Sequence, residues 1–404
     1  MKIGRYLPPA AAPLSVKDLI RGLSGIIDPD KAIVNLKQSL CKQFDKKHCF
    51  LLSSGKAALT LSLQALSKLF PDRNEIIIPA FNCYSVPSAI IRAGLIVRPC
   101  DIEPDTLQMK DKALLNILNG NNKVLAIIPT HLFGLPADTN HLRTIVKDEQ
   151  ITIIEDAAQA MGSDYQGTLL GTKGDIGIFS LARGKTISAG EGGIIITDSD
   201  KIATTISVQI DAIPDYTSLQ LINITIQSAA LTWLIHPNLF WIPKMMPFLK
   251  LGETIFDPDF SIRKLSGFQA GIMNRWHDKI SWLISKRSKW VCLYSQHLSG
   301  IDGTSCFTNT PALTSMPLIR FPIVINDTGA IEEILFQSER LGLGISKTYP
   351  DSVDSLSQVN NDKYSSCENA KTAARTILTL PCHPLVKEKD FYRIVGVIRS
   401  VMNK

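Results

Sequence analysis

Between residues 48 and 197, the chain alternates short apolar runs with stretches in which apolar residues recur every three or four positions. The runs are His48–Leu52, Glu75–Pro79, Ile96–Cys100, Val124–Pro129, Ile151–Glu155, Ile176–Ser180 and Ile194–Thr197. Runs of Ile, Val and Leu without polar alternation are typical of strands that are covered on both faces. Amphipathic segments such as Ala57–Leu69 and Val86–Ala93 lie between them. This order predicts an α/β domain with a mostly parallel sheet and right-handed crossovers.

The rest of the chain predicts two further parts. A long helix is expected to begin near Lys264, because one apolar stripe follows it: Leu265, Phe268, Ile272, Trp276, Ile280 and Leu283. After Gly300 we expect a smaller α+β unit with a strand at Leu318–Ile325 and helices at Ile331–Leu341 and Asp390–Met402. The predicted division is a large α/β domain (1–263, with an apolar insert at 205–263), a connecting helix (264–299) and a small C-terminal α+β domain (300–404).

Composition excludes several classes of protein. With 45% hydrophobic residues, the 404-residue chain is not disordered. Its net charge of +6 is scattered along the sequence, so we expect no nucleic-acid partner. The eight cysteines form no CxxC pair or zinc-ligand spacing, so no metal is expected. Because Pro8, Pro9 and Pro13 interrupt the region where a secretory leader would need an apolar run, we expect reduced thiols and a cytoplasmic protein.

Two residues that follow predicted strands carry the chemistry. Asp156 follows the run at 151–155, and Lys185 lies in the loop after the run that ends at Ser180. The carboxyl ends of parallel strands form the ligand-binding edge of an open sheet, so both side chains are expected at that edge. A lysine that forms a Schiff base, and a carboxylate that keeps a pyridine nitrogen protonated, suit pyridoxal phosphate. Taken alone, the Asp could be a helix cap and the Lys a solvated loop residue.

A phosphate site is expected upstream. The segment Ser53–Leu59 (SSGKAAL) follows a predicted strand and opens a helix. Free backbone N–H groups and the positive end of the helix dipole would bind an anion there. A serine-capped helix that binds nothing is the plainer alternative.

These motifs resemble the DegT/StrS-type sugar aminotransferases, which are pyridoxal phosphate enzymes of fold type I. The similarity covers about residues 30–200, 264–275 and 376–402. It rests on SSGKAAL (53–59), IIIPAFNCYSVPSAIIRAG (76–94), CDIEPDTL (100–107), IIPTHLFGLPAD (127–138), IIEDAAQAMGSDYQG (153–167), GDIGIFSLARGKTISAGEGGIIIT (174–197) and LPCHPLV (380–386). Several motifs in matching order make the resemblance specific.

The resemblance implies a role for each site residue. Lys185 is implied to form the Schiff base, Asp156 to pair with the pyridine nitrogen, and Gln159 to lie beside the ring hydroxyl. The implied phosphate ligands are Ser180 and the backbone amides of Gly55 and Lys56. Some relatives carry histidine at the lysine position and dehydrate sugars, so lysine here favours transamination.

The chain also departs from the family pattern. Lys56 replaces the usual threonine and could bind phosphate as a point charge. Cys83 and Tyr84 occupy the region where an aromatic ring usually covers the cofactor, and which of them does so here is open. Ile262 and Lys264 replace the asparagine and arginine of a segment that the second subunit usually contributes to the phosphate site.

Two further features have alternative interpretations. His131 could be a general base, although we favour a structural role bracing the cofactor loop. The aromatic segment 229–251 is broken by Pro237, Pro243 and Pro247 and cannot span a membrane as one helix. It could contact a membrane surface or a lipid-linked substrate, or it could form a subunit interface, which we favour. Its apolar and basic residues are Trp233, Phe240, Trp241, Lys244, Met245, Met246, Phe248 and Lys250.

The sequence therefore predicts a homodimeric, pyridoxal phosphate-dependent aminotransferase. By resemblance, it would transfer an amino group from glutamate to a keto sugar, in the nucleotide-linked form, for surface polysaccharide or secondary-metabolite synthesis. Two alternatives stay open. One is dehydration or deoxygenation of a sugar on the same scaffold, and the other is a non-catalytic protein that keeps the fold.

Overall fold

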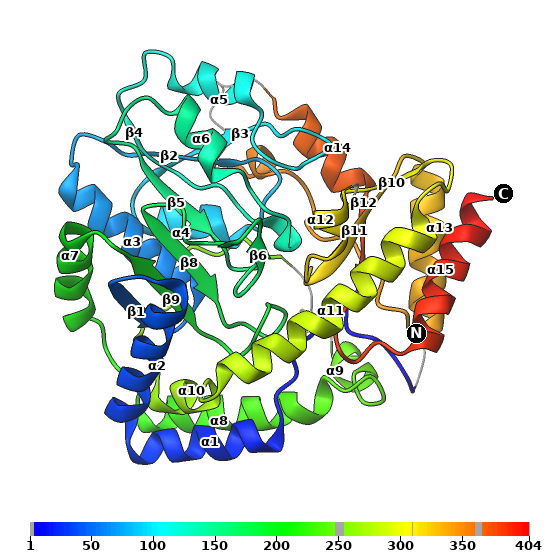
Figure 1. Cartoon of the computed structure of the whole chain (residues 1–404), viewed down its shortest axis with the longest axis horizontal. Helices are drawn as coiled ribbons and strands as arrows, with labels where there is room; N and C mark the ends of the chain where they lie inside the picture. The colour runs from blue at the N-terminus through cyan, green and yellow to red at the C-terminus, as the bar shows by residue number, and fades with distance from the viewer. Residues whose placement is uncertain (1–3, 247–253, 309, 360–365, 404) are drawn as a thin grey trace.

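A seven-stranded sheet forms the centre of the molecule in the computed structural model, which describes residues 4–246, 254–308, 310–359 and 366–403 (Figure 1). The strand order is β1-β9-β8-β5-β4-β2-β3, and β9 alone runs antiparallel to its neighbours. The strands are β1 His48–Leu52, β2 Glu75–Pro79, β3 Ile96–Cys100, β4 Val124–Ile127, β5 Thr152–Asp156, β8 Ile176–Ser180 and β9 Gly193–Thr197. The predicted α/β class with a mostly parallel sheet is confirmed. Three predicted runs differ slightly from the structure: β4 ends at Ile127, β5 spans Thr152–Asp156 and β9 begins at Gly193.

Helices cover both faces of this sheet. On one face, α3 Gly55–Leu69, α4 Ser85–Arg92 and α7 Asp200–Asp211 enclose apolar side chains such as Ile78 and Ile195. On the other face, α2 Pro29–Phe44 packs with Phe179 of β8, whose ring centroid lies 4.7 Å from that of Phe44. The helices α5 Asp111–Leu118 and α6 Thr139–Ile145 cover β4 and its neighbours. Burial on both faces explains the unbroken apolar runs of the strands.

The predicted single helix from Lys264 is wrong, because the structure has two helices there. Helix α10 spans Gly267–Ile272 and α11 spans Trp276–Leu298. Between them Arg275 adopts a left-handed backbone conformation with φ +61°, which no helix interior allows. The apolar stripe crosses this break without interruption, since Ile272 and Trp276 are both buried. The periodicity therefore conceals the break.

A second, three-stranded antiparallel sheet follows. Its order is β10-β11-β12, and these strands span Thr304–Cys306, Arg320–Ile325 and Ile377–Pro381. The helices around it are α12 Pro311–Thr314, α13 Thr328–Leu341, α14 Glu368–Thr376 and α15 Glu388–Met402. We propose that the two sheets mark the large and small domains of the predicted division, with α11 running from one to the other (Figure 1).

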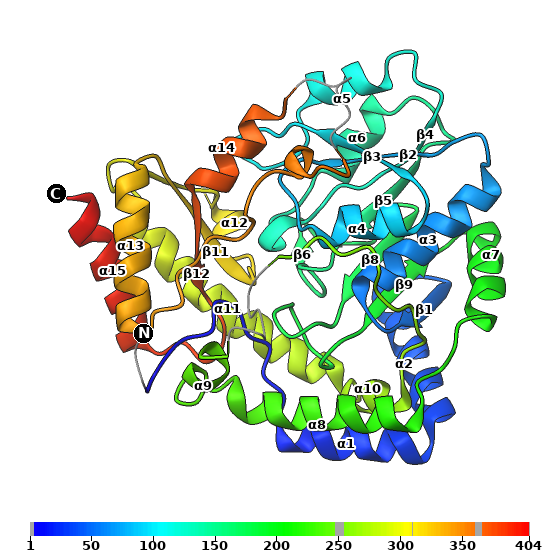
Figure 2. The same cartoon turned by 180° about the vertical axis from the view of Figure 1, so that it is seen from behind.

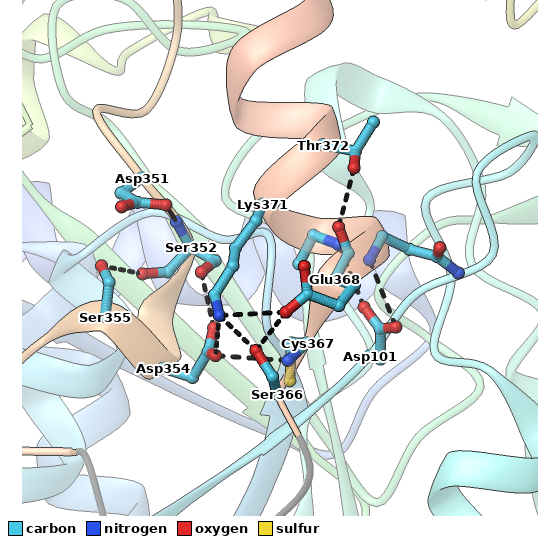
Figure 3. Close-up of polar contacts among 12 residues, drawn as sticks. Asp101, Asp351, Ser352, Asp354, Ser355, Ser366, Cys367, Glu368, Lys371 and Thr372 are labelled. Atoms are coloured by element: carbon cyan, nitrogen blue, oxygen red, sulfur yellow. Dashed lines mark hydrogen bonds and ion pairs between the residues drawn. The ribbon is translucent and has the colours of Figure 1, made fainter.

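Polar contacts join the C-terminal unit to the large sheet (Figure 3). Asp101, just after β3, accepts hydrogen bonds from the backbone N–H groups of Asn369 and Ala370 at the start of α14. Beside it, the ammonium group of Lys371 lies 3.6 Å from Asp354 and 3.3 Å from Glu368. This cluster holds segment 351–355 and α14 against the edge strand β3.

The predicted apolar insert contains α8 Ser218–Leu234 and the short α9 Trp241–Lys244. Helix α8 lies beside α1 Val16–Ile27 along one edge of the molecule in both views (Figures 1 and 2). Within the described residues, no helix has the length and apolar character needed to cross a bilayer. Pro247, Phe248 and Lys250 of the predicted aromatic segment lie outside the described residues.

Candidate functional site

A cavity of about 600 Å³ opens at the carboxyl ends of β5 and β8. Asp156, the last residue of β5, and Ser180, the last residue of β8, line it together with Lys185. The structure thus brings three of the residues with predicted cofactor roles to one cavity, as expected for strands that end at a common edge.

The start of α3 forms the floor of an anion cradle in this cavity. Ser54 caps the helix by accepting a hydrogen bond from the N–H of Ala57 at 3.2 Å. A Cβ on Gly55 would lie 3.0 Å from Cβ and 3.2 Å from Oγ of Ser180, so only glycine leaves the space between helix and strand open. Unpaired helix N–H groups and the Ser180 hydroxyl together suit a phosphate.

Two cations border the cradle. The ammonium of Lys56 lies 3.3 Å from a carboxylate oxygen of Asp257 and 4.2 Å from the ring centroid of Phe260. Arg263 also lines the cavity, and its backbone exchanges hydrogen bonds with the backbone and hydroxyl of Ser53. Sequence reasoning missed Arg263, because the family pattern directed attention to Lys264.

Asp156 is buried and lines the same cavity as Lys185. Its Oδ1 accepts a hydrogen bond from the N–H of Ala158 at 3.0 Å. Burial raises the pKa of Asp156, although the charge of Lys185 and the bond from Ala158 act in the opposite direction. A cationic partner stabilises the charged form of a buried carboxylate, and a protonated pyridine nitrogen is such a partner.

The buried residues His131 and Glu155 form a pair next to Asp156. Nε2 of His131 lies 2.8 Å from Oε2 of Glu155, and Nδ1 of His131 accepts a hydrogen bond from the N–H of Ala137. The N–H of His131 donates to the carbonyl oxygen of Asp156 at 3.0 Å. Both ring nitrogens are therefore occupied, which favours the structural role expected for His131.

The loop that carries Lys185 is held by a residue that sequence reasoning missed. Arg287 of α11 is fully buried and donates to the carbonyl oxygens of Lys185 at 3.0 Å, Thr186 at 2.6 Å and Ala11 at 3.2 Å. Burial lowers the pKa of Arg287 to about 10, so it remains charged at neutral pH. The sequence signal that could have identified Arg287 is its place as a single arginine within the apolar stripe of this long helix.

Gln159 is buried one turn after Asp156. Its Oε1 accepts a hydrogen bond from the N–H of Phe133, and its Nε2 lies 3.3 Å from the hydroxyl of Tyr349. Gln159 is not among the residues that line the cavity, so its contact with the cofactor hydroxyl stays a prediction.

The structure separates Cys83 from Tyr84. Cys83 lines the cavity, whereas the hydroxyl of Tyr84 donates to the carbonyl oxygen of Asp351 at 3.1 Å. Tyr84 is not part of the cavity wall in the described structure. Of the two residues left open by the sequence, Cys83 is the one that can contact a bound ring.

The segment predicted to reach a second subunit lies against the chain's own cavity. Ile262 packs with the apolar cluster around α3, and the ammonium of Lys264 lies 3.8 Å from Asp215. Neither lines the cavity, although their neighbour Arg263 does.

These residues fit pyridoxal phosphate. The cradle offers N–H groups and a hydroxyl for the phosphate, and Asp156 and Lys185 border the remaining space with Cys83. The cavity volume of about 600 Å³ lies within the range of small-molecule sites, so a substrate can bind beside the cofactor.

Comparison with known proteins identifies a family for this chain. The family described as the DegT/DnrJ/EryC1/StrS aminotransferase family matches residues 20–221 and 256–399. The stretch between the two matched segments contains most of α8 and all of α9.

Solved structures of similar fold cover almost the whole chain. The aminotransferase PseC of Helicobacter pylori, involved in the biosynthesis of pseudoaminic acid, superposes with a TM-score of 0.78 at 16% identity, covering 98% of this chain and 99% of its own. DesI, solved in the presence of its TDP-sugar product, has a TM-score of 0.77 at 17% identity, covering 100% and 94%. The E. coli GDP-4-keto-6-deoxy-D-mannose-3-dehydratase with bound hydrated PLP has a TM-score of 0.75 at 19% identity, covering 99% and 100%. These likenesses support the fold, and the family match over most of the chain supports the chemistry. The chain belongs to the DegT/DnrJ/EryC1/StrS aminotransferase family, whose members are pyridoxal phosphate-dependent enzymes of fold type I.

Proposed function

We propose that the protein transfers an amino group from L-glutamate to the keto group of a nucleotide-linked sugar, for surface polysaccharide or secondary-metabolite synthesis. The observation that carries the proposal is that Lys185, Asp156 and the Gly55–Ser180 cradle border one cavity. DesI, a protein of the same fold, has a TDP-sugar as its product, and this supports a nucleotide-linked acceptor.

Each site residue has a task in this reaction. Bound pyridoxal phosphate supplies an electrophilic carbon and a ring that accepts electrons. Nζ of Lys185 takes the proton from the α-carbon of the amino donor. Lys56 also lines the cavity, where its ammonium group lies 3.3 Å from a carboxylate oxygen of Asp257. Asp156 keeps a negative charge where the ring nitrogen would lie.

The proposal is tested with purified protein and pyridoxal phosphate. Adding L-glutamate should change the cofactor absorbance, and adding TDP-4-keto-6-deoxyglucose, or its UDP- or GDP-linked counterpart, should restore it. One 2-oxoglutarate should form for each amino sugar. An absorbance that L-glutamate leaves unchanged contradicts glutamate as donor. A product that has lost a hydroxyl group and gained no nitrogen would indicate the dehydratase alternative.

We also propose that the enzyme is a cytoplasmic homodimer. Its nucleotide-linked acceptor and eight unpaired cysteines support a reducing compartment. The inner side of helix α1 contains Asp18, Gly22 and Gly25, which are buried. Its apolar residues face outward: Val16, Ile20, Leu23 and Ile27 are each at least half exposed.

Helix α8 continues this apolar face beside α1. Leu219 is 80% exposed, Ile226 61% and Trp233 62%. The helix contains no charged residue. Membrane-surface helices usually carry Lys and Arg on their polar face, whereas the cores of subunit interfaces are depleted of charge. The α1/α8 face therefore favours a second copy of the chain over a lipid surface.

A further inference from the structure

Helix α8 presents a row of amides to the cofactor cavity. Gln220, Asn223 and Gln227 line the cavity together with Ile224, and Lys185 belongs to the same cavity lining. Their spacing of three and four residues places the amides on one face of the helix. Asn223 and Gln227 also lie in the part of the chain that the family match leaves out.

The position of α8 over the cavity is fixed by two contacts with the lysine loop. Ser228 is buried, and its Oγ would lie 2.9 Å from a Cβ on Gly190, so the helix packs directly on this glycine. Nη2 of Arg183, two residues before Lys185, donates to Oε1 of Gln227 at 3.2 Å. The amide row and the reacting lysine are therefore parts of one connected wall.

The amide row has unused hydrogen-bonding capacity. Nε2 of Gln227 donates to Oδ1 of Asn223 at 3.2 Å, and Oε1 of Gln220 accepts from the backbone N–H of Thr217. Among the described residues, Nδ2 of Asn223 and Nε2 of Gln220 have no hydrogen-bond partner. These two NH₂ groups belong to residues that line the cavity, so they can serve as hydrogen-bond donors to a bound molecule.

We propose that the amide face of α8 binds hydroxyl groups of the sugar substrate, with Asn223 as its central ligand. Amides offer a donor and an acceptor side by side, as a hydroxyl group requires. A carboxylate or phosphate would favour a cation, and α8 has none, whereas Lys56, Lys185 and Arg263 line other parts of the cavity. The inference rests on the proposed aminotransfer to a keto sugar.

The test compares the two halves of the reaction in the holoenzyme. Asn223→Leu keeps the side-chain size and removes both hydrogen-bonding groups. We expect KM for the keto-sugar nucleotide that the wild type accepts to rise about five- to tenfold, the usual effect of losing a hydrogen bond to an uncharged group. The rate with L-glutamate alone, followed by cofactor absorbance, should stay within about twofold of the wild type. Asn223→Gln should recover part of the sugar affinity.

Thr225→Ala is the matched control, because the Thr225 hydroxyl donates to the carbonyl of Leu221 within the same helix. It should leave both halves unchanged, and circular dichroism should confirm that α8 is folded in each variant. An Asn223→Leu enzyme with unchanged KM for the sugar overturns the inference, as does an equal loss in both halves. If the wild type reacts with L-glutamate but with none of the TDP-, UDP- and GDP-linked keto sugars, the proposed acceptor is wrong, and the inference fails with it.

Discussion

Arg287 and Lys185 are joined through the backbone: Nη2 of the arginine donates to the carbonyl oxygen of the lysine at 3.0 Å. The same guanidinium donates to Thr186 and Ala11, so one buried cation fixes the lysine loop and the N-terminal segment against α11. Arg287 therefore fixes the backbone position of the loop that carries Lys185.

Replacing Arg287 should separate this positioning role from ordinary stability. Arg287→Leu leaves three carbonyl oxygens without their donor, and we expect unfolding free energy to fall by about 3 kcal/mol. Arg287→Lys keeps the charge and part of the bonding, so it should fold while binding pyridoxal phosphate at least about tenfold more weakly. Urea unfolding and cofactor titration measure the two effects. Lys289→Ala, at an exposed pair on the same helix, is the control. Normal cofactor affinity in Arg287→Lys would contradict the positioning role.

Filling the anion cradle should weaken cofactor binding without unfolding the protein. The Cβ of Gly55→Ala would lie 3.0 Å from Cβ of Ser180, so the strand must yield or the space for phosphate shrinks. Titration with pyridoxal phosphate should give a Kd raised about tenfold or more. A Cβ on Gly396 of α15 meets nothing within 4 Å, so Gly396→Ala should stabilise the helix by about 0.5–1 kcal/mol and leave Kd unchanged. Unchanged affinity in Gly55→Ala would place the phosphate elsewhere.

The buried Glu155 should make stability depend on pH in the acid range. Burial acts to raise the pKa of Glu155, but hydrogen bonds from His131, Gly174 and Gly171 outweigh it, so the net pKa is lowered. A carboxyl group with a lowered folded-state pKa stabilises the fold fully above its unfolded value of about 4.3. This stabilisation is lost as pH falls through the folded-state pKa.

Glu155→Gln should therefore be less stable than the wild type at pH 7 by about 1–3 kcal/mol, and the difference should shrink toward pH 3.5. Urea unfolding at both pH values measures it. Glu149→Gln, at an exposed position, should show no such change. A constant difference at both pH values would mean that Glu155 contributes no pH-linked stability.

A charge on the α1/α8 face should separate the subunits. Ile20 is 60% exposed and Ile226 61%. Light scattering should give twice the chain mass of 44.5 kDa for the wild type and the single mass for Ile20→Glu or Ile226→Glu. Phe336→Glu, on the exposed side of α13, should stay dimeric. A monomeric wild type that floats with anionic lipid vesicles would assign this face to a membrane.

The strands of the large sheet could be predicted from the sequence because each is buried on both faces. β1, β2, β3 and β8 have the predicted bounds. Asp156 and Lys185 could be predicted because parallel strands end at one edge, so residues 29 positions apart meet at the same cavity. The break after α10 could not be predicted, since Arg275 carries no sequence signal for a left-handed conformation.

Residues that act through distant packing were also missed. Arg287 is about 100 positions from the loop it holds, and Arg263 reaches the cavity through backbone pairing with Ser53. For the aromatic segment 229–251, the apolar residues were enough to predict an interface. Helix α8, whose last residues belong to this segment, could be assigned to the cavity lining only once the fold placed Gln220, Asn223 and Gln227 beside the cofactor site.

Reduction of the holoenzyme with borohydride, followed by peptide mass spectrometry, tests the chemical assignment most directly. Among the described residues, the lysines that line the cavity are Lys56 and Lys185, and of these only Lys185 lies within the loop that Arg287 holds. We expect a pyridoxyl group on the peptide containing Lys185 and none in Lys185→Ala. A pyridoxyl group on Lys56, or no adduct on any lysine of the wild type, would contradict the assignment of Lys185 as the residue that binds the cofactor.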